Sequence, residues 1–366
     1  MYTSLSIKNF RAFRTLEVEG LKRVNLFAGR NNSGKTSVLA AVYLLEGEHV
    51  TLRAKRLFAT RGLAVVPFTS YSARTMPWAT LFRDLGVDGE VKISGRHEAV
   101  HTLDVILTTS VTKEDKSFLT SVGAPKLDFE ALPVLIARRD HFAEKRDALW
   151  VIGGTVESNT LSESSLRKSS YLVAGTKPDH VELARYFDSL EYEKRTAPVV
   201  EALRLIDPRL SVLKTNISAG PSLILVDMGG ATLLPLAVVG DGMFRMIEIV
   251  FAFLQNREKV VFIDEIENGF HYSVLPKVWK LIHEIAKLDF IQSCQRPKWL
   301  FIGTPPEPRE FLAVACKTVT AKKVLANVTS RNANTRRKCG GIYLPHSRSP
   351  SIGDRSHSQS WISCVS

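Results

Sequence analysis

Three short groups of residues have the types and spacing needed to handle a phosphate ester. The first is GRNNSGKT, from Gly29 to Thr36, which matches the spacing G-x-x-x-x-G-K-[ST]. A loop of this kind turns its backbone N–H groups onto phosphate oxygens. Lys35 can then reach the β- and γ-phosphates, and the Thr36 hydroxyl can ligate Mg²⁺. The loop therefore predicts nucleotide binding, and the alternative is an ordinary strand-to-helix turn without a ligand.

The second group is a pair of carboxylates, Asp264 and Glu265, within VVFIDEIENG. The apolar run before them predicts a buried strand, and its carboxyl end is the edge of a parallel sheet where ligands bind. One carboxylate can complete a Mg²⁺ shell, and its neighbour can polarise an attacking water. The alternative is an acidic first turn that stabilises the start of a helix.

The third group is the glycine-rich turn GDGMFR, from Gly240 to Arg245. It precedes an apolar helical pattern, and the N-terminus of a helix can bind a second phosphate group. The alternative is a helix start that binds no ligand.

A guanine-specific site is the competing interpretation, because TKED, from Thr112 to Asp115, resembles the [NT]KxD element of GTPases. A GTPase also needs DxxG between the two elements. Asp84, Asp88 and Asp104 are the aspartates there, and none has glycine three residues later. The one DxxG begins at Asp227, in the wrong order. We therefore interpret TKED as a solvated turn.

The elements that must position these groups form an α/β pattern. SLSIKNFRAFRTLEVEG alternates apolar and polar residues in two runs and predicts a β-hairpin or two edge strands. RVNLFAG predicts a buried strand, and KTSVLAAVYLLE predicts a helix that is apolar on nearly all faces. A strand, a glycine-rich turn and a helix form the first unit of an α/β fold.

Later segments continue the alternation of strands and helices. EVKISG, TLDVILTTSV, PVLIARRD and LWVIGGTV predict strands, and SNTLSESSLRKSS predicts a loop. From Asp179 the pattern predicts one or two helices, then a hairpin of LSVLKTNI and SLILVDM. GDGMFRMIEIVFAFLQ, KVVFIDE and SVLPKVWKLIHEIAKL predict a helix, a strand and an amphipathic helix. Ser273 is the expected N-cap of the last, and Pro276 falls in its first turn.

Composition separates the last 76 residues from the rest of the 366-residue chain. Residues 291–366 hold 12 Lys/Arg and 3 acids, so they carry +9 of the net charge of +12 and leave +3 for residues 1–290. The body therefore makes no general electrostatic case for nucleic-acid binding. All four cysteines also lie there, at spacings that suggest neither zinc binding nor disulfides: Cys294, Cys316, Cys339 and Cys364.

No segment predicts a membrane span or a secretory leader. No run reaches about 18 consecutive apolar residues, and MYTSLSIKNFRAF lacks a basic region followed by an apolar one. A cytoplasmic protein without membrane contact is the expectation.

Taken in order, LSIKNFRAF, GRNNSGKTSVLAAV, LPLAVVGDGMFR and VVFIDEIENGFHYSVLPKVWKLI resemble ATP-binding-cassette-type ATPases of the OLD/RecF/SMC group, with OLD-like ATPases most similar. The resemblance covers both ends of residues 1–290. It implies an α/β P-loop fold of the ABC-ATPase type, with a mixed sheet, flanking helices and an N-terminal antiparallel β subdomain. The implied ATPase domain is 1–290 with a loosely matched insert at about 50–210, followed by an atypical tail at 291–366.

The resemblance also implies roles for particular residues. Asp264 and Thr36 would hold Mg²⁺, and Lys35 and Glu265 would be catalytic, with Glu265 as the base. Glu267, Asn268 and His271 would line a dimer interface. The Walker A residues that would bind ATP are Gly29, Arg30, Asn31, Asn32, Ser33, Gly34, Lys35, Thr36 and Ser37. Gly240, Asp241 and Gly242 would form the signature turn, which reaches the γ-phosphate held by a partner subunit.

The expected function is an ATP-dependent homodimeric switch in phage defence or DNA maintenance, with nucleic acid or an effector protein as a further partner. One alternative is an ATP-binding protein that hydrolyses poorly. Another is a RecF-like DNA-repair ATPase, for which Lys8, Arg11 and Arg14 form the basic cluster near the N-terminal sheet. The tail has too few acids for the Toprim nuclease domain of full OLD proteins, so nuclease activity is not expected.

The C-terminal segment departs from the family where its switch histidine is due. Relatives place a strand after the Walker B helix, which here would start near Phe290, with the histidine near Lys298. WLFIGT can serve as the strand, but prolines follow it and no histidine occurs between His283 and His346. We hypothesise a frameshifted or replaced end from about Ile291, which predicts a truncated parallel sheet and weak turnover. The alternative is a genuine disordered basic tail.

In the phosphate loop, the Lys35 side chain is expected to face solvent when no ligand is bound.

Overall fold

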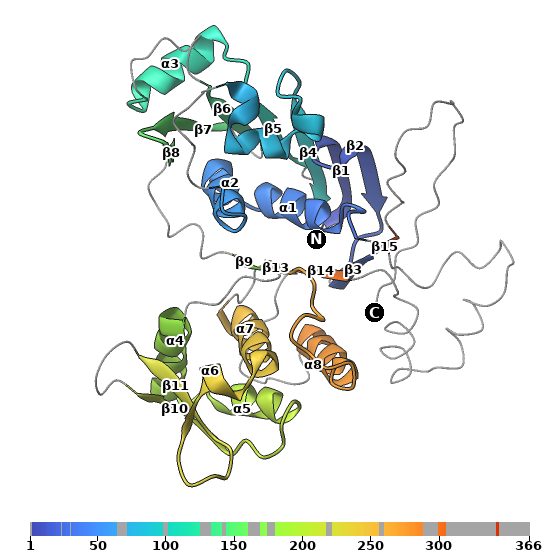
Figure 1. The fold of residues 1–366 in the computed structure, drawn as a ribbon. Coiled ribbons are helices and arrows are strands. Elements are labelled where there is room, and N and C mark those ends of the chain that lie inside the picture. The colour runs from blue at the N-terminus through green and yellow to red at the C-terminus, as the bar shows by residue number, and fades with distance from the viewer. Residues whose placement is uncertain are drawn as a thin grey trace, which may run out of the picture. The chain divides into compact units, whose positions relative to one another are not determined.

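A seven-stranded antiparallel sheet forms the first of two compact units in the computed structural model, in the order β2-β1-β4-β5-β6-β7-β8. This unit, here unit 1, comprises Met1–Ser169 and Gly340–Val365, and unit 2 comprises Ser170–Cys339 and Ser366. Each is described by itself (Figure 1). The structure describes residues 2–22, 24–29, 31–63, 72–97, 102–124, 133–140, 144–159, 169–173, 180–216, 222–255, 260–287, 299–304 and 342–343.

The strands of this sheet follow the alternating pattern of the sequence. The predicted N-terminal hairpin is confirmed, because β1 and β2 pair antiparallel from Ser4↔Glu19 to Phe10↔Phe13. Three of the four predicted middle strands are also present, whereas LWVIGGTV, predicted as one strand, turns at Gly153 and Gly154 and divides between the antiparallel strands β7 and β8. The strands are β1 Tyr2–Phe10, β2 Phe13–Glu19, β4 Val91–His97, β5 Thr102–Thr108, β6 Leu135–Asp140, β7 Lys145–Ile152 and β8 Thr155–Ser158.

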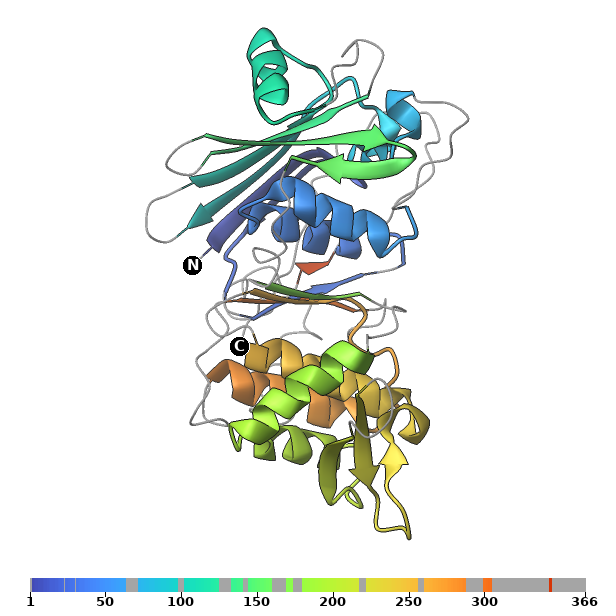
Figure 2. The same ribbon diagram turned by 90° about the vertical axis from the view of Figure 1, so that its left-hand side faces the viewer.

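Helices cover both faces of the sheet of unit 1. α1 (Lys35–Leu45) and α2 (Val50–Ala59) lie against one face, and α3 (Lys113–Ser121) lies against the other (Figure 2). α1 is buried at every residue except Thr36, as its apolar sequence predicts. β3 (Val24–Ala28) leads to α1 and pairs in parallel with β15 (Ile342–Tyr343). Three 3₁₀ turns precede β4: Ala73–Thr75, Pro77–Leu81 and Arg83–Leu85.

Unit 2 contains a small sheet in which β13 lies between β14 and β9. All four residues of β13 are buried, and β13 and β14 run parallel from Val260↔Trp299 to Ile263↔Ile302. In both views α7 and α8 run along one side of these strands (Figures 1 and 2). The elements are β9 Ser169–Leu172, β13 Val260–Ile263, β14 Trp299–Thr304, α7 Asp241–Gln255 and α8 Leu275–Lys287.

Other helices of unit 2 pack on α7. Phe251 of α7 contacts Tyr186 edge-to-face at 4.9 Å and stacks at 6.4 Å on Phe187, which lies in the predicted helical segment after Asp179. The predicted hairpin is confirmed as β10 and β11, with β12 beside β11. The bounds are α4 His180–Tyr192, α5 Ala197–Arg204, β10 Val212–Asn216, β11 Leu223–Asp227, β12 Leu234–Pro235 and α6 Leu236–Val239.

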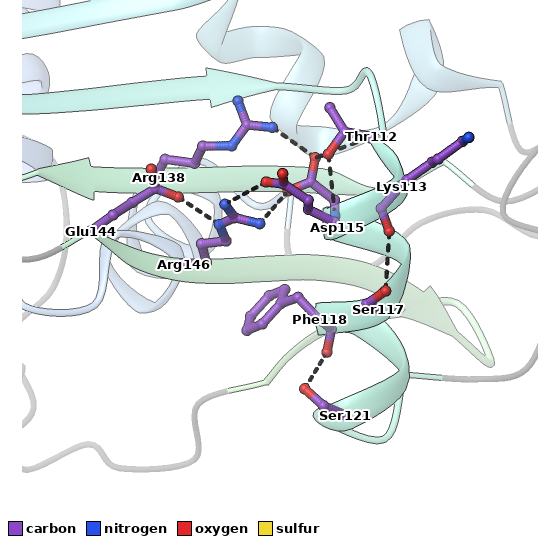
Figure 3. Close-up of polar contacts among 10 residues, drawn as sticks. Thr112, Lys113, Asp115, Ser117, Phe118, Ser121, Arg138, Glu144 and Arg146 are labelled. Carbon is purple, nitrogen blue, oxygen red and sulfur yellow. Dashed lines mark hydrogen bonds and ion pairs between the residues drawn. The ribbon is translucent and has the colours of Figure 1, made fainter.

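The interpretation of Thr112–Asp115 as a solvated turn is wrong. Thr112 is the N-cap of α3, and its hydroxyl accepts a hydrogen bond from the Asp115 N–H at 3.2 Å (Figure 3). The Asp115 carboxylate is fully buried, accepts from Arg138 at 2.7 Å and lies 3.5 Å from Arg146. These two arginines are directly opposite each other on β6 and β7, so the sheet needs a negative charge between them.

One further expectation changes in unit 2. Ser273 does not cap α8, since Val274 occupies that position and the Ser273 hydroxyl lies 2.8 Å from Nδ1 of His271. WLFIGT forms β14 (Trp299–Thr304) beside β13, as the sequence allowed, and the truncated parallel sheet stays a prediction because residues 305–341 lie outside the described ranges. The middle of the predicted Ser-rich loop, residues 160–168, lies outside the described residues, whereas Ser158 ends β8 and Ser169 and Ser170 begin β9. Most of the C-terminal segment also lies outside the described residues. The division of the chain at residue 290 stays a prediction.

Candidate functional site

The phosphate loop, Gly29–Ser37, joins β3 to α1 in unit 1. Asn32 has φ +63° and Gly34 has φ +98°, so the chain bends twice through left-handed conformations before the helix begins. Gly34 is the N-cap of α1, and neither a capping side chain nor an acidic residue occupies the first turn. The first N–H groups of a helix need acceptors, so this start fits an anion. Arg30, a predicted contact, lies outside the described residues.

Gly34 is required for space as well as for conformation. A Cβ at this position would lie 2.4 Å from Cζ of Phe13, the first residue of β2. No real side chain tolerates that distance, and an L-residue at this φ adds strain of about 1–2 kcal/mol. The β2 strand therefore supports the loop through Phe13, a residue that the sequence motif does not include.

Lys35 is buried, which contradicts the expectation that it faces solvent. Its side chain is only 7% exposed, and Nζ donates a hydrogen bond to the Gly29 carbonyl oxygen at 2.7 Å. Lys35 is the first residue of α1, a helix buried on nearly all sides, so its side chain lies against the loop rather than in solvent. The ammonium is therefore held desolvated beside the turn that would receive phosphate.

The hydroxyl groups of the loop complete the test of whether a triphosphate fits. Ser33 Oγ is buried and has no hydrogen-bond partner among the described residues. Burial of a hydroxyl without a partner is costly, and a phosphate oxygen would satisfy it. Ser37 is also buried, whereas Thr36 is half-buried at the start of α1. The residues of the loop therefore fit a nucleoside triphosphate, and the Thr36 hydroxyl could ligate its Mg²⁺ ion.

The carboxylate pair, Asp264 and Glu265, directly follows β13 in unit 2. Asp264 is 4% exposed, and its main chain is fixed on both sides. Its N–H donates to the Leu172 carbonyl of β9 at 2.9 Å, and its carbonyl accepts from Nη2 of Arg245 at 2.8 Å. The second contact comes from α7, one helical turn after the glycine-rich turn.

Glu265 adopts a left-handed conformation, with φ +46°. Such a backbone is uncommon outside glycine and costs on the order of 1 kcal/mol or more. Its carboxylate Oε2 accepts a hydrogen bond from Nδ2 of Asn268 at 2.7 Å, and the Asn268 N–H donates to the Glu265 carbonyl at 3.1 Å. The strained residue is thus the one predicted to be the catalytic base.

The Gly240–Gly242 turn and the loop after β13 touch through their backbones. A Cβ on Gly242 would lie 2.8 Å from the Gly269 carbonyl oxygen, so only glycine permits this approach. Gly240 has φ +124°, and α7 starts at Asp241. Two motifs that the sequence places about 25 residues apart therefore meet in unit 2.

The chain also matches models of known protein families. A family model described as "AAA ATPase domain" matches residues 1–105. A second model, described as "AAA domain, putative AbiEii toxin, Type IV TA system", matches residues 110–301, more than half of the chain. The chain belongs to this family of AAA domains. The broad resemblance seen in the sequence is confirmed at that level, together with the α/β fold class.

Curated relatives of this AAA domain include a Helicobacter pylori protein named "ATP/GTP phosphatase", which is 23% identical over 360 residues and is matched over 88% of this chain and 89% of its own. The "DNA replication and repair protein RecF" of Nitrosococcus oceani is 51% identical over 43 residues, 12% of each chain. Among solved structures, an SMC head bound to the C-terminal winged-helix domain of ScpA has a TM-score of 0.42 at 13% identity, covering 84% of this chain and 89% of that one.

The AAA domain thus presents its predicted residues in two groups, the phosphate loop in unit 1 and the carboxylate pair with the glycine-rich turn in unit 2. Among the described residues no cluster of three or more His, Cys, Asp or Glu could hold a metal ion. Within the same ranges, no helix is both long and apolar enough to cross a membrane.

Two residues to which sequence reasoning assigned no role hold the site in place, namely Phe13 and Arg245, the last residue of the GDGMFR group. Arg245 is 7% exposed and also lies 3.5 Å from the Glu248 carboxylate. Burial raises the pKa of Glu248, and the Arg245 guanidinium offsets part of that shift. A charged residue three positions after GDG in an apolar helix was the available signal for Arg245.

Proposed function

We propose that this AAA domain is a Mg²⁺-dependent ATPase of the OLD/RecF/SMC-like class that works as a nucleotide-controlled homodimeric switch. The observation that carries the proposal is the phosphate loop. It combines an uncapped helix start, a buried hydroxyl of Ser33 without a partner among the described residues and a desolvated Lys35. The relative named "ATP/GTP phosphatase" supports a nucleoside triphosphate as the substrate.

The residues would divide the work as follows. Lys35 exchanges the Gly29 carbonyl for oxygens of the β- and γ-phosphates. Thr36 and Asp264 would hold Mg²⁺, which neutralises charge on the phosphates when bound. Glu265 orients a water molecule and accepts its proton as the water oxygen attacks the γ-phosphorus. The bond from the γ-phosphorus to the bridging oxygen breaks, and ADP leaves with that oxygen.

ATP is favoured over a guanine-specific substrate by the environment of Asp115. In the TKED element this carboxylate would have to bind the guanine base. It is instead fully buried and hydrogen-bonded to Thr112 and Arg138. An equilibrium binding titration with ATP and GTP tests this preference, and much tighter GTP binding would contradict it.

The homodimer is proposed from the Gly240–Gly242 turn, which would complete the site of the partner subunit. Glu265→Gln should block hydrolysis, because an amide accepts no proton from water, and should accumulate an ATP-bound dimer. Light scattering after size-exclusion chromatography with ATP and Mg²⁺ measures this. A monomer under all nucleotide conditions would refute the switch and leave the turn as a helix start without a ligand.

A second candidate is an ATP-binding protein with weak turnover. β14 takes the strand position that follows the Walker B helix in relatives, and Thr304 ends it. Two prolines follow and no histidine occurs before His346, so the switch histidine is missing where it is due. The proposal of a replaced end from about Ile291 therefore stands beside that of a genuine basic tail. The coding DNA decides between them, since another reading frame past codon 290 should encode an apolar strand followed by a Thr/Ser-His pair.

Two biological roles are proposed. One is phage defence, and the other is DNA maintenance through a RecF-like repair activity. The short match to a RecF protein supports testing DNA. Steady-state hydrolysis with and without double-stranded DNA separates the two, because DNA stimulation favours the repair role. An effector protein as partner remains the alternative when DNA changes nothing.

A further inference from the structure

Arg245 connects the glycine-rich turn to the carboxylate pair inside unit 2. We infer that Arg245 is a positioning residue that sets the orientation of Glu265 and transmits displacement of the Gly240–Gly242 turn to it. The inference rests on the proposed function, because it assigns a role within the same ATPase site.

The first step is the identity of the atom that Arg245 holds. Nη2 donates to the carbonyl oxygen of Asp264 at 2.8 Å. A peptide unit is planar, so that oxygen and the N–H of Glu265 lie in one rigid plane. Holding the oxygen therefore fixes the plane from which the Glu265 backbone continues. Since Glu265 has φ +46°, a small rotation of this plane redirects its side chain.

The second step is the stiffness of the connection. Arg245 is 7% exposed on α7, a helix of 15 residues that buries most of its length in unit 2. Its second nitrogen, Nη1, lies 3.5 Å from Glu248 on the next turn of the same helix. The guanidinium is thus held at two points, and its position follows α7 rather than solvent.

The third step is the link from the turn to the carboxylates. Gly242 lies against the Gly269 carbonyl, and Gly269 ends the loop that begins at Glu265. Any ligand that moves the turn displaces the start of α7 and, with it, Arg245. The turn therefore reaches the carboxylate pair by two routes, the backbone contact and the guanidinium. Under the proposed dimer, a γ-phosphate of one site would be sensed at Glu265 of the other.

The matched test replaces an arginine–carbonyl hydrogen bond at two places in the same unit. Arg245→Lys keeps the charge but loses the two-point contact, and Arg245→Met removes both. Arg204→Lys is the control, because Arg204 also donates to main-chain carbonyls, those of Leu210 and Ser211, at 2.8 and 3.1 Å. Its contacts lie outside all three motifs.

We expect Arg245→Lys to lower kcat about 10- to 100-fold, since an oriented general base contributes about 10²- to 10⁴-fold. The ATP dissociation constant should stay within about twofold, because the phosphate loop is untouched. Arg245→Met should be slower than Arg245→Lys, and Arg204→Lys should equal the wild type. An unchanged kcat in folded Arg245→Lys, or an equal loss in Arg204→Lys, would overturn the inference.

Amide hydrogen exchange provides a readout that needs no hydrolysis. In Arg245→Lys, residues 262–268 should exchange faster than in the wild type, whereas Arg204→Lys should leave this segment unchanged. Exchange that is equal in all three proteins overturns the inference. ATP with Mg²⁺ should slow exchange there in the wild type and much less in Arg245→Lys. A wild type that neither hydrolyses nor responds to ATP contradicts the proposed function, while the ligand-free comparison still decides the role of Arg245.

Discussion

Replacement of Lys35 by methionine tests the phosphate loop most directly. In the ligand-free protein, Nζ is buried and donates to the Gly29 carbonyl at 2.7 Å. Methionine has a similar length, fills the same space and needs no acceptor. The change removes one hydrogen bond from a charged group, worth about 1.5–3 kcal/mol, but it also removes the need to bury an ammonium. We therefore expect the free energy of unfolding to change by less than about 2 kcal/mol.

The effect on ATP should be larger than the effect on stability. Because Lys35 is already desolvated, it reaches phosphate without a further solvation penalty, and its contact with an anion is charge-assisted. Loss of about 1.5–3 kcal/mol corresponds to ATP binding that is about 10- to 150-fold weaker. Calorimetric titration without Mg²⁺ isolates this step from hydrolysis, and thermal unfolding of the same sample measures stability.

Lys55→Met is the matched control for this experiment. Lys55 lies on α2 in the same unit, is half-buried and has its Nζ 3.7 Å from the Glu157 carboxylate. It should bind ATP as the wild type does. ATP affinity that is equal in Lys35→Met and Lys55→Met refutes the phosphate loop. A loss of affinity that accompanies unfolding of Lys35→Met would instead assign the lysine a purely structural role.

Two further substitutions probe unit 1. Gly34→Ala should abolish ATP binding, because its Cβ would lie 2.4 Å from the Phe13 ring. Adding Phe13→Leu to this variant should restore stability more than ATP binding, since an alanine at φ +98° stays strained. Thermal unfolding and ATP titration compare the wild type, the single variant and the double variant. Asp115→Asn should lower the free energy of unfolding by about 3 kcal/mol at pH 7, because the partly buried Arg138 and Arg146 lose the carboxylate that balances their charge. Burial by itself raises the pKa of Asp115, but hydrogen bonds from Thr112 and Arg138 outweigh it and hold the pKa below its usual value. The stabilisation is therefore present above the ordinary aspartate pKa of about 3.9 and is lost as the pH falls through the folded pKa. Denaturant unfolding from pH 7 to pH 3 should show the wild type approaching the variant, and a constant difference would contradict the ion pair.

The regular elements could be predicted because their local and tertiary preferences agree. Alternating residues in β1 and β2 place Leu5, Ile7, Leu16 and Val18 in the core. A helix that is apolar on all sides, such as α1, has few alternatives to burial. The four residues of β13 are apolar and all are buried. Periodicity was sufficient for these elements since one face, or the whole element, is removed from water.

The misread polar residues depend on partners far away in the sequence. Thr112 and Asp115 have the spacing of a capping box, so their helix start was open to prediction. The burial of Asp115 was not, because it follows from the register that sets Arg138 opposite Arg146. Lys35 was expected in solvent for a similar reason. Its acceptor is a carbonyl six residues earlier, and only the closed loop brings the two together.

Some departures from local backbone preference lie beside the predicted carboxylate pair, while others among the described residues, such as Asn9, Asp84 and Lys194, lie outside the predicted site. Glu265 is left-handed without being glycine, while Gly240 and Gly269 adopt positive φ on either side of it in the sequence. Such conformations persist only where the surrounding contacts over-determine them. Here the contacts are the Arg245 hydrogen bond to Asp264, the Asn268 hydrogen bond to Glu265 and the approach of Gly242 to Gly269. None of them contributes to a regular element, and each lies within one loop of the carboxylate pair. A loop held in this way for stability alone would be expected to relax toward ordinary conformations. This retained strain supports the proposal that Glu265 is the catalytic base.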